Sequence, residues 1–315
     1  MNNYKYLPSG DKTPIGLVYL DNNLIEIIKI NVRIYLYPIF NILISIFLTK
    51  KYFKNYYYKP DLCLISQRGN DYETHRKRVN NFIDLQNSKI LVAGCGTASD
   101  IYSWYKYKPK EILGLDWFNY EKAWKLWNEK YQNSSNKNIV KFAQADISDI
   151  NFIDDEYFDV IGSDAVFEHV ADLNSVVSEF HRILKFGGIL YATYGPLWYA
   201  WGGDHISGYD SINNGYNHLL LNEEDYLMYI SKMGDFLHNE NDGRTWIKNN
   251  MFSYLRQTEY INILEKHGFK KEFISVIIDK RALKCLSDFK HREKLLNRYE
   301  LNDLIVCAMT IIYRK

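Results

Sequence analysis

The sequence predicts an α/β protein of the doubly wound, Rossmann-like type, with a mostly parallel sheet of seven strands. The first observation is a series of short apolar segments typical of buried strands, near residues 89–93, 111–115, 139–143, 157–162 and 188–194. The second is that helix-like segments separate them, because strands that alternate with helices pair in parallel. The third is a glycine turn, Gly94-Cys95-Gly96, directly after the first of these strands.

The flanking segments complete this architecture. Residues 71–86 are expected to form a helix that leads into the first strand. A second helix is expected near 252–267, where His267-Gly268 provides a C-terminal stop. Strands near 272–278 and 303–313 finish the sheet.

Two domains are expected, an N-terminal helical extension over residues 1–60 and a main domain over 61–315. Residues 195–250 form an insertion after the fifth strand that is rich in glycine and aromatic residues. A connection of this length is usually functional, and we expect it to cover the substrate.

The extension is apolar and basic. Its residues 1–60 hold eight Lys or Arg against three Asp or Glu. The uninterrupted apolar part, Ile34 to Leu48, is 15 residues long and contains Pro38, whereas a membrane-spanning helix needs about 20 apolar residues. It also lacks the features of a secretory signal. Two alternatives remain: residues 24–58 contact a membrane surface peripherally, or they pack on the protein itself or on a second subunit of a homodimer.

Bulk properties narrow the function classes. The net charge of +1 and the pI of about 7.6 indicate no nucleic-acid partner. The four cysteines are scattered without a Cys-x-x-Cys pair, which suits a reducing compartment and argues against structural zinc. We therefore expect a cytoplasmic protein, with the inner face of the membrane as the alternative location.

Acidic residues follow the strands at the edge where such sheets bind ligands. Asp116 ends the second strand, 20 residues after Gly96, which is the position of a carboxylate that accepts hydrogen bonds from a ribose. Asp146 and Asp164 end the third and fourth strands. A nicotinamide dehydrogenase is disfavoured, because Ser99 stands where that fingerprint has its third glycine.

Six motifs follow one another along the chain: Val92-Ala-Gly-Cys-Gly, Gly114-Leu-Asp116, Ala145-Asp146, Phe158-Asp-Val, Phe167-Glu-His-Val170 and Arg182-Ile-Leu-Lys-Phe-Gly-Gly188. This ordered set resembles the class I S-adenosylmethionine-dependent methyltransferases, in the branch that acts on small molecules and surface polysaccharides. The resemblance covers about residues 90–193, and it implies that the last two strands, near 272–278 and 303–313, form an antiparallel pair. The chain departs from the family pattern at Ala98, where a third glycine is frequent, and at Phe186, where proline is usual.

The resemblance implies that the cofactor is S-adenosyl-L-methionine and assigns its contacts. Its methionine part would lie on Gly94, Cys95 and Gly96, its ribose on Asp116 and its adenine ring on Trp117. Asp146 and the backbone of Ile147 would contact the adenine amine. Asp164 is a further candidate for cofactor binding. The alternative for these aspartates is a structural role as helix caps.

Two segments offer groups for the chemistry. The first, in the 195–250 insertion, carries the expected proton acceptor, His205, next to Asp204, which could orient hydroxyls or act as the base. Trp198 and Trp201 of the same segment can stack on a sugar. The second segment follows the fourth strand and holds Asp164, Glu168 and His169. His169 is a second catalytic candidate, and in some relatives such residues hold a divalent metal, although a site without metal is favoured here.

The leading hypothesis is an S-adenosylmethionine-dependent O-methyltransferase that acts on a sugar hydroxyl or glycan precursor, by in-line methyl transfer with a histidine base. The second keeps the enzyme class but moves the acceptor to a lipid-like small molecule such as a quinone, with a divalent metal as an option. The third is a non-catalytic domain that binds a cofactor or a partner protein.

Overall fold

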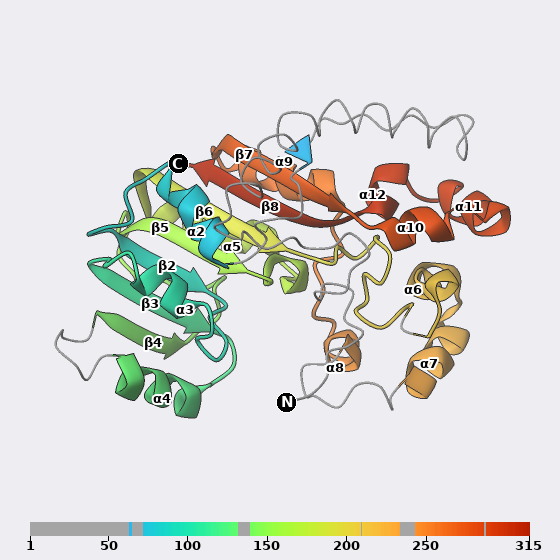
Figure 1. The fold of residues 1–315 in the computed structure, drawn as a ribbon, viewed down its shortest axis with the longest axis horizontal. Helices are drawn as coiled ribbons and strands as arrows, with labels where there is room; N and C mark the ends of the chain where they lie inside the picture. Colours follow the sequence, from blue (N-terminus) through green and yellow to red (C-terminus); the bar gives the residue numbers. More distant parts are fainter. Residues whose placement is uncertain (1–62, 65–71, 132–138, 209, 234–242, 287) are drawn as a thin grey trace, which may run out of the picture. The chain divides into compact units, whose positions relative to one another are not determined.

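The computed structural model describes residues 63–64, 72–131, 139–208, 210–233, 243–286 and 288–315 (Figure 1). The proposed extension over residues 1–60, with its segment 24–58, lies outside the described residues. Within the described part, no helix has both the length and the apolar character needed to cross a membrane.

The described strands form one sheet in the order β1-β7-β8-β6-β5-β2-β3-β4. Its first strand, β1, has only two residues and pairs in parallel with β7. The other seven are the strands expected from the sequence, and the expected Rossmann-like fold is confirmed. The strands are β1 (Cys63–Leu64), β2 (Lys89–Ala93), β3 (Glu111–Asp116), β4 (Val140–Gln144), β5 (Phe158–Asp164), β6 (Leu184–Tyr194), β7 (Lys270–Ile278) and β8 (Val306–Arg314).

The strand order reverses at β2, which lies between β3 and β5 (Figure 1). Leu91 of β2 is in register with Leu113 of β3 on one side and with Ile161 of β5 on the other. Both pairings are parallel, so the three carboxyl ends meet at one edge. A point where the strand order reverses is the usual ligand site of an open α/β sheet.

The last strand runs against the others, as expected. Gly187 in β6 donates its N–H to the carbonyl of Lys315, while Thr193, further along β6, contacts Thr310 through the two side-chain hydroxyls. Residue numbers therefore rise along β6 as they fall along β8, which is the antiparallel arrangement.

The helices differ from the expected ranges at their ends. The helix expected over 71–86 stops at Asn80, whose side chain accepts the N–H of Leu85. The helix expected over 252–267 begins only at Gln257 and stops before Gly268, as expected. The helices are α2 (Tyr72–Asn80), α3 (Ile101–Tyr105), α4 (Glu121–Tyr131), η1 (Phe167–His169), α5 (Leu173–Ile183), η2 (Ile212–Asn214), α6 (Asn217–Leu220), α7 (Glu223–Lys232), α8 (Gly243–Lys248), α9 (Gln257–Lys266), α10 (Lys280–Cys285), α11 (Phe289–Leu296) and α12 (Leu301–Ile305).

The described chain divides into two compact units. The first, which we call the sheet unit, contains residues 71–194, 260–274 and 310–315. The second, which we call the insertion unit, contains β1 and residues 195–259 and 275–309. The insertion expected over 195–250 thus shares its unit with the C-terminal segment that holds α10 to α12.

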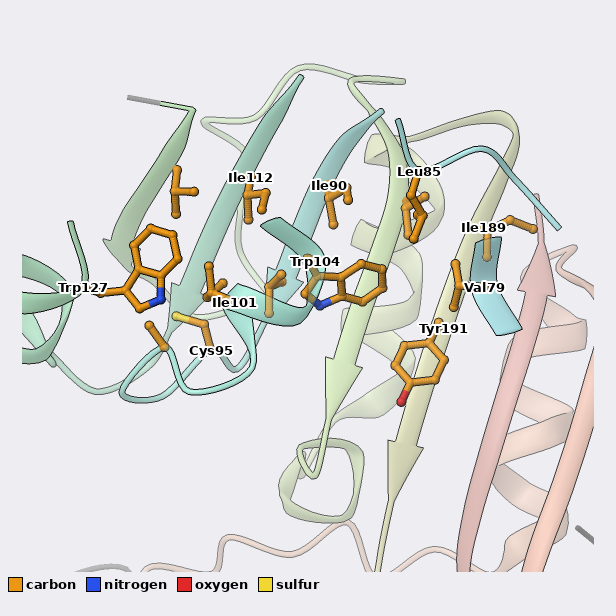
Figure 2. Packing of buried hydrophobic residues seen from close by; sticks show 14 of the residues in the cluster. Val79, Leu85, Ile90, Cys95, Ile101, Trp104, Ile112, Trp127, Ile189 and Tyr191 are labelled. Carbon is orange, nitrogen blue, oxygen red and sulfur yellow. The ribbon is translucent and has the colours of Figure 1, made fainter. Parts of the chain in front are cut away.

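The sheet unit has an apolar core centred on Trp104 of α3, which is fully buried (Figure 2). Its ring meets Tyr191 of β6 edge-on at a centroid distance of 6.1 Å. Gly162 in β5 makes room for this indole, because a Cβ there would lie 2.3 Å from the Trp104 ring. This packing fixes α3, the helix that follows the glycine turn, against the sheet.

Candidate functional site

The glycine turn after β2 is held by the next strand. The backbone N–H groups of Gly94 and Cys95 both donate to the carbonyl of Leu115, at 2.8 and 2.9 Å. The N–H of Gly96 donates to Oδ2 of Asp116 at 2.7 Å, and its carbonyl accepts the indole N–H of Trp124 at 2.8 Å. Two of the predicted motifs, the turn and Asp116, are therefore joined directly.

Gly94 cannot be replaced by a larger residue without a shift of its surroundings. Its φ of +75° lies in the left-handed region, and a Cβ would come within 2.1 Å of Val166 Cγ2. Val166 belongs to the loop after β5, so the turn passes close to a neighbouring strand end. Glycine at this position therefore makes room for Val166, whereas the turn is open at Gly96, where nothing lies within 4 Å of the Cβ position.

Asp116 is buried to 9% exposure at the end of β3. Its Oδ1 accepts the N–H of Phe118 at 2.9 Å, in addition to the bond from Gly96 to Oδ2. Burial raises the pKa of this carboxyl, and the two backbone N–H groups counteract that rise. A carboxylate can accept about four hydrogen bonds, so the carboxylate retains capacity for two hydroxyl donors.

The residues predicted to contact adenine lie at the ends of β3 and β4. Trp117 is 60% exposed, so its ring is available to a ligand. Asp146 is exposed, and its Oδ1 accepts from the N–H and the hydroxyl of Ser148. Ile147 is buried. Asp146 thus closes a local turn through Oδ1, and it caps no helix, since no helix lies between β4 and β5 in the described range 139–208.

Asp164 is engaged in a buried charge cluster. Its Oδ2 accepts from Arg76 Nη2 at 2.6 Å, and its Oδ1 accepts the Tyr191 hydroxyl at 2.6 Å. Arg76 also pairs with Asp100 at 3.4 Å. Burial raises the pKa of Asp100, and the neighbouring Asp164 adds to that rise.

Arg76 is a site residue that the sequence reasoning missed. It comes from α2, is 0% exposed, and its guanidinium lies over the Trp104 ring at 3.9 Å from the centroid. Its Nη1 has no hydrogen-bond partner among the described residues. In the sequence it stands beside Lys77 and Arg78, which makes the run resemble a solvated basic surface.

The metal candidates do not gather around one point. No group of three His, Cys, Asp or Glu side chains in the described ranges is arranged to hold a metal ion. Asp164 uses both oxygens within the charge cluster. Glu168 is buried in η1 near Tyr194, whereas His169 is partly exposed.

In the insertion unit, His205 is buried to 7% exposure and has a left-handed backbone with φ of +62°. Its ring packs edge-on against Trp246 at a centroid distance of 4.8 Å and lies 5.6 Å from Phe252. The imidazole therefore has a defined orientation within an aromatic group.

Asp204 is fully buried and holds the turn that carries His205. Its Oδ1 accepts the N–H groups of Ile206 and Ser207, and its Oδ2 accepts the hydroxyls of Ser207 and Tyr226 at 2.8 and 2.7 Å. Four donors occupy this carboxylate, so it is placed to stabilise the loop.

The two predicted stacking residues differ in exposure. Trp201 is only 3% exposed, and its indole N–H donates to the carbonyl of Ile212 at 2.8 Å. Trp198 is partly exposed and contacts Tyr254 at a centroid distance of 4.5 Å. Trp198 can thus offer a face to a ligand, while Trp201 fills the interior of its own unit.

The family comparison gives the class of the central part of the sheet unit. Residues 91–192 match the family model described as "Methyltransferase domain". The match runs from β2 to β6 and so includes the glycine turn, Asp116 and Asp164. Residues 91–192 form a class I methyltransferase domain. As the motifs predicted, this methyltransferase domain belongs to the S-adenosylmethionine-dependent class.

Curated relatives match only part of this chain. The chain is 29% identical over 108 residues to a malonyl-[acyl-carrier protein] O-methyltransferase of Hamiltonella defensa, over 34% of this chain and 38% of that protein. It is 27% identical over 123 residues to a demethylmenaquinone methyltransferase of Bacteroides fragilis, over 39% of this chain and 49% of that protein. The chain thus spans less than half the length of these curated relatives.

Among solved structures, the chain is similar to an S-adenosylmethionine-dependent methyltransferase from Mesorhizobium loti. The sequence identity is 16% and the TM-score is 0.47, and the alignment covers 78% of this chain and 99% of that one.

Proposed function

We propose that the whole chain is an S-adenosylmethionine-dependent methyltransferase. The observation that carries the proposal is the joined turn and carboxylate, in which Gly96 donates to Asp116 at the edge where the strand order reverses. This arrangement leaves acceptor capacity on a buried carboxylate beside a backbone that a ligand can approach closely.

When bound, the cofactor supplies a methyl group on a sulfonium, and the chain holds it in place. Asp116 accepts the ribose hydroxyls, and Gly94 to Gly96 accommodate the methionine part. Trp117 lies on the adenine, with Asp146 and Ile147 at its edge. Asp164 acts here by fixing Arg76, whose remaining buried N–H is suited to a carboxylate such as that of the methionine part.

For the acceptor, we propose a hydroxyl of a sugar or glycan precursor. Methyl transfer to an alcohol requires removal of a proton, and His205 is the proposed base. Its oriented imidazole supports this role, and Asp204 supports it indirectly by holding the turn. Trp198 is the proposed stacking residue. We assign Trp201 to the interior of the insertion unit, and His169 is kept as the second candidate base.

A second candidate acceptor is a lipid-like molecule such as a quinone. Two observations favour it: the similarity to a demethylmenaquinone methyltransferase and the apolar, basic composition of residues 24–58. On this alternative the chain acts at the inner face of the membrane, rather than in the cytoplasm at large. Vesicle co-sedimentation of the intact chain against one lacking residues 1–54 separates the alternatives, since equal partitioning removes the membrane argument.

Isothermal titration with S-adenosylhomocysteine tests the cofactor assignment. We expect micromolar binding, and absence of heat at high micromolar ligand would refute it. Methyl transfer from labelled S-adenosylmethionine to nucleotide sugars and to a demethylmenaquinol analogue then tests the acceptor class. Binding without transfer to either class would favour the third hypothesis, a non-catalytic cofactor- or partner-binding domain. Size-exclusion chromatography with light scattering tests the proposed homodimer.

A further inference from the structure

A separate polar cluster of the insertion unit surrounds Asp303, a residue that none of the roles above uses. Asp303 lies on α12, and its side chain is 4% exposed. Its Oδ2 accepts no hydrogen bond from any residue that the structure describes, and its ion-pair partner, Arg256 Nη1, stands 3.5 Å away. A buried carboxylate oxygen without a close donor costs free energy, so a donor from a ligand would satisfy it.

Aromatic side chains that reach the solvent adjoin this pair. The guanidinium carbon of Arg256 lies 5.6 Å from the centroid of the Tyr199 ring. The rings of Tyr199 and Tyr299 are 5.5 Å apart at an interplanar angle of 46°. These three side chains are each partly exposed, whereas Asp303 is buried. The cluster therefore combines a buried acceptor with two accessible aromatic rings and a cation.

Gln257, the residue after Arg256, provides a second acceptor without a hydrogen-bond partner among the described residues. It stands at the start of α9 and is 3% exposed, and the acceptor atom is its Oε1. Unpaired buried acceptors are uncommon in folded proteins. Both of these neighbour Arg256, Gln257 along the sequence and Asp303 through the ion pair, which indicates that a ligand supplies the missing donors.

The local charge selects the kind of donor. Burial raises the pKa of Asp303 to about 6, Arg256 lowers it, and the nearby Glu300 and Glu259 raise it further. Three carboxylates near one guanidinium disfavour an anionic ligand. Neutral hydroxyl groups suit the site better, because each donates a hydrogen bond to an acceptor without adding negative charge.

We propose that Asp303, Arg256 and Tyr199 bind a sugar ring through two adjacent hydroxyls. They would form the acceptor subsite of the sugar methylation proposed above, on which this inference rests. Asp303 accepts from the hydroxyls, and Arg256 donates to a hydroxyl or ring oxygen. The Tyr199 ring packs on the C–H face of the sugar. Tyr199 directly follows Trp198, so consecutive residues of one loop serve this subsite and the aromatic group around His205.

Saturation-transfer NMR on the full chain tests the proposal, with the methyl glycosides of glucose, galactose, mannose and rhamnose as probes at millimolar concentration. We expect binding of at least one glycoside by the wild type. Asp303→Asn and Arg256→Gln should weaken it about tenfold or more, the scale for a lost hydrogen bond to a charged group. The matched control, Glu293→Gln, changes an exposed carboxylate of the same unit and should bind as the wild type does.

Thermal melts separate binding from folding. Asp303→Asn removes a buried charge that lacks a close donor, so its Tm should equal or exceed that of the wild type. A lower Tm together with weaker binding would overturn the proposal, because it would show a structural role. Unchanged binding in Asp303→Asn, binding of tetramethylammonium in place of sugars, or no glycoside binding by a protein that binds S-adenosylhomocysteine would also overturn it. Glycoside binding without S-adenosylhomocysteine binding would instead support the subsite and refute the proposed function.

Discussion

Replacing Asp116 with alanine should separate the cofactor role of this carboxylate from its role in the turn. Two of its four acceptor positions serve the N–H groups of Gly96 and Phe118. The remaining two are proposed to accept the ribose hydroxyls. Loss of hydrogen bonds to a charged group costs about 1.5–3 kcal/mol, which corresponds to about 10- to 150-fold weaker binding of S-adenosylhomocysteine.

The same change also leaves two backbone donors near the end of β3 without their acceptor. Each unpaired donor that stays buried costs about 1–3 kcal/mol of folding stability, less where water reaches it. A lower Tm is therefore expected alongside the weaker binding. Asp116→Asn keeps one carbonyl oxygen and should lie between the wild type and alanine in both measurements.

Isothermal titration and thermal melts of the same preparations provide the comparison. Asp154→Asn serves as the control, because Asp154 is an exposed carboxylate of the same unit. An Asp116→Ala protein that is less stable but binds S-adenosylhomocysteine with unchanged affinity would show that the ribose lies elsewhere.

Three further changes test other parts of the reasoning. His205→Ala should lower the rate of methyl transfer about 10²- to 10⁴-fold at unchanged S-adenosylhomocysteine affinity. A chelator should leave the wild-type rate unaltered. Near-normal turnover by His205→Ala would show that another residue is the base. Gly162→Ala should lower the Tm more than Gly187→Ala does. A Cβ at position 162 would lie 2.3 Å from the buried Trp104 ring, whereas a Cβ at position 187 would meet open space and only the backbone strain of φ +78°. Burial raises the pKa of Asp303 to about 6 from an ordinary value of about 4, so the folded state binds this proton more tightly than the unfolded state does. The free energy of unfolding of the wild type should therefore fall by about 2–3 kcal/mol as the pH rises from about 4 to about 6. Asp303→Asn should abolish that part of the slope in melts across this range, and an identical slope would contradict the assignment.

Strand positions were predictable because the signals are local. The run from Lys89 to Ala93 is continuous and apolar, and a glycine turn ends it, so both the strand and the turn follow from neighbouring residues. The end of α2 was not predictable in this way, because it depends on the side chain of Asn80, which accepts a hydrogen bond from the backbone N–H of Leu85. Sequence periodicity does not show which polar side chain turns back on the chain.

Roles that depend on distant partners were also beyond the sequence. Arg76 and Asp164 are 88 residues apart, and nothing near either residue indicates that they pair. Trp201 could equally stack on a ligand or fill an interior. The difference lies in Gly208 and Gly215, where a Cβ would come within 2.3 and 1.9 Å of its indole and which thus provide the space that the ring occupies.

The charge cluster around Arg76 has a consequence for how small a fragment of this protein can be. The family match begins at residue 91, whereas Arg76 belongs to α2, ahead of that boundary. A fragment cut at the matched residues would retain Asp100 and Asp164 without their shared cation. Two neighbouring carboxylates left in a dry interior would have to take up protons or draw in water, since an isolated buried charge is too costly to keep. A fragment that keeps these two carboxylates paired with their cation must therefore include α2.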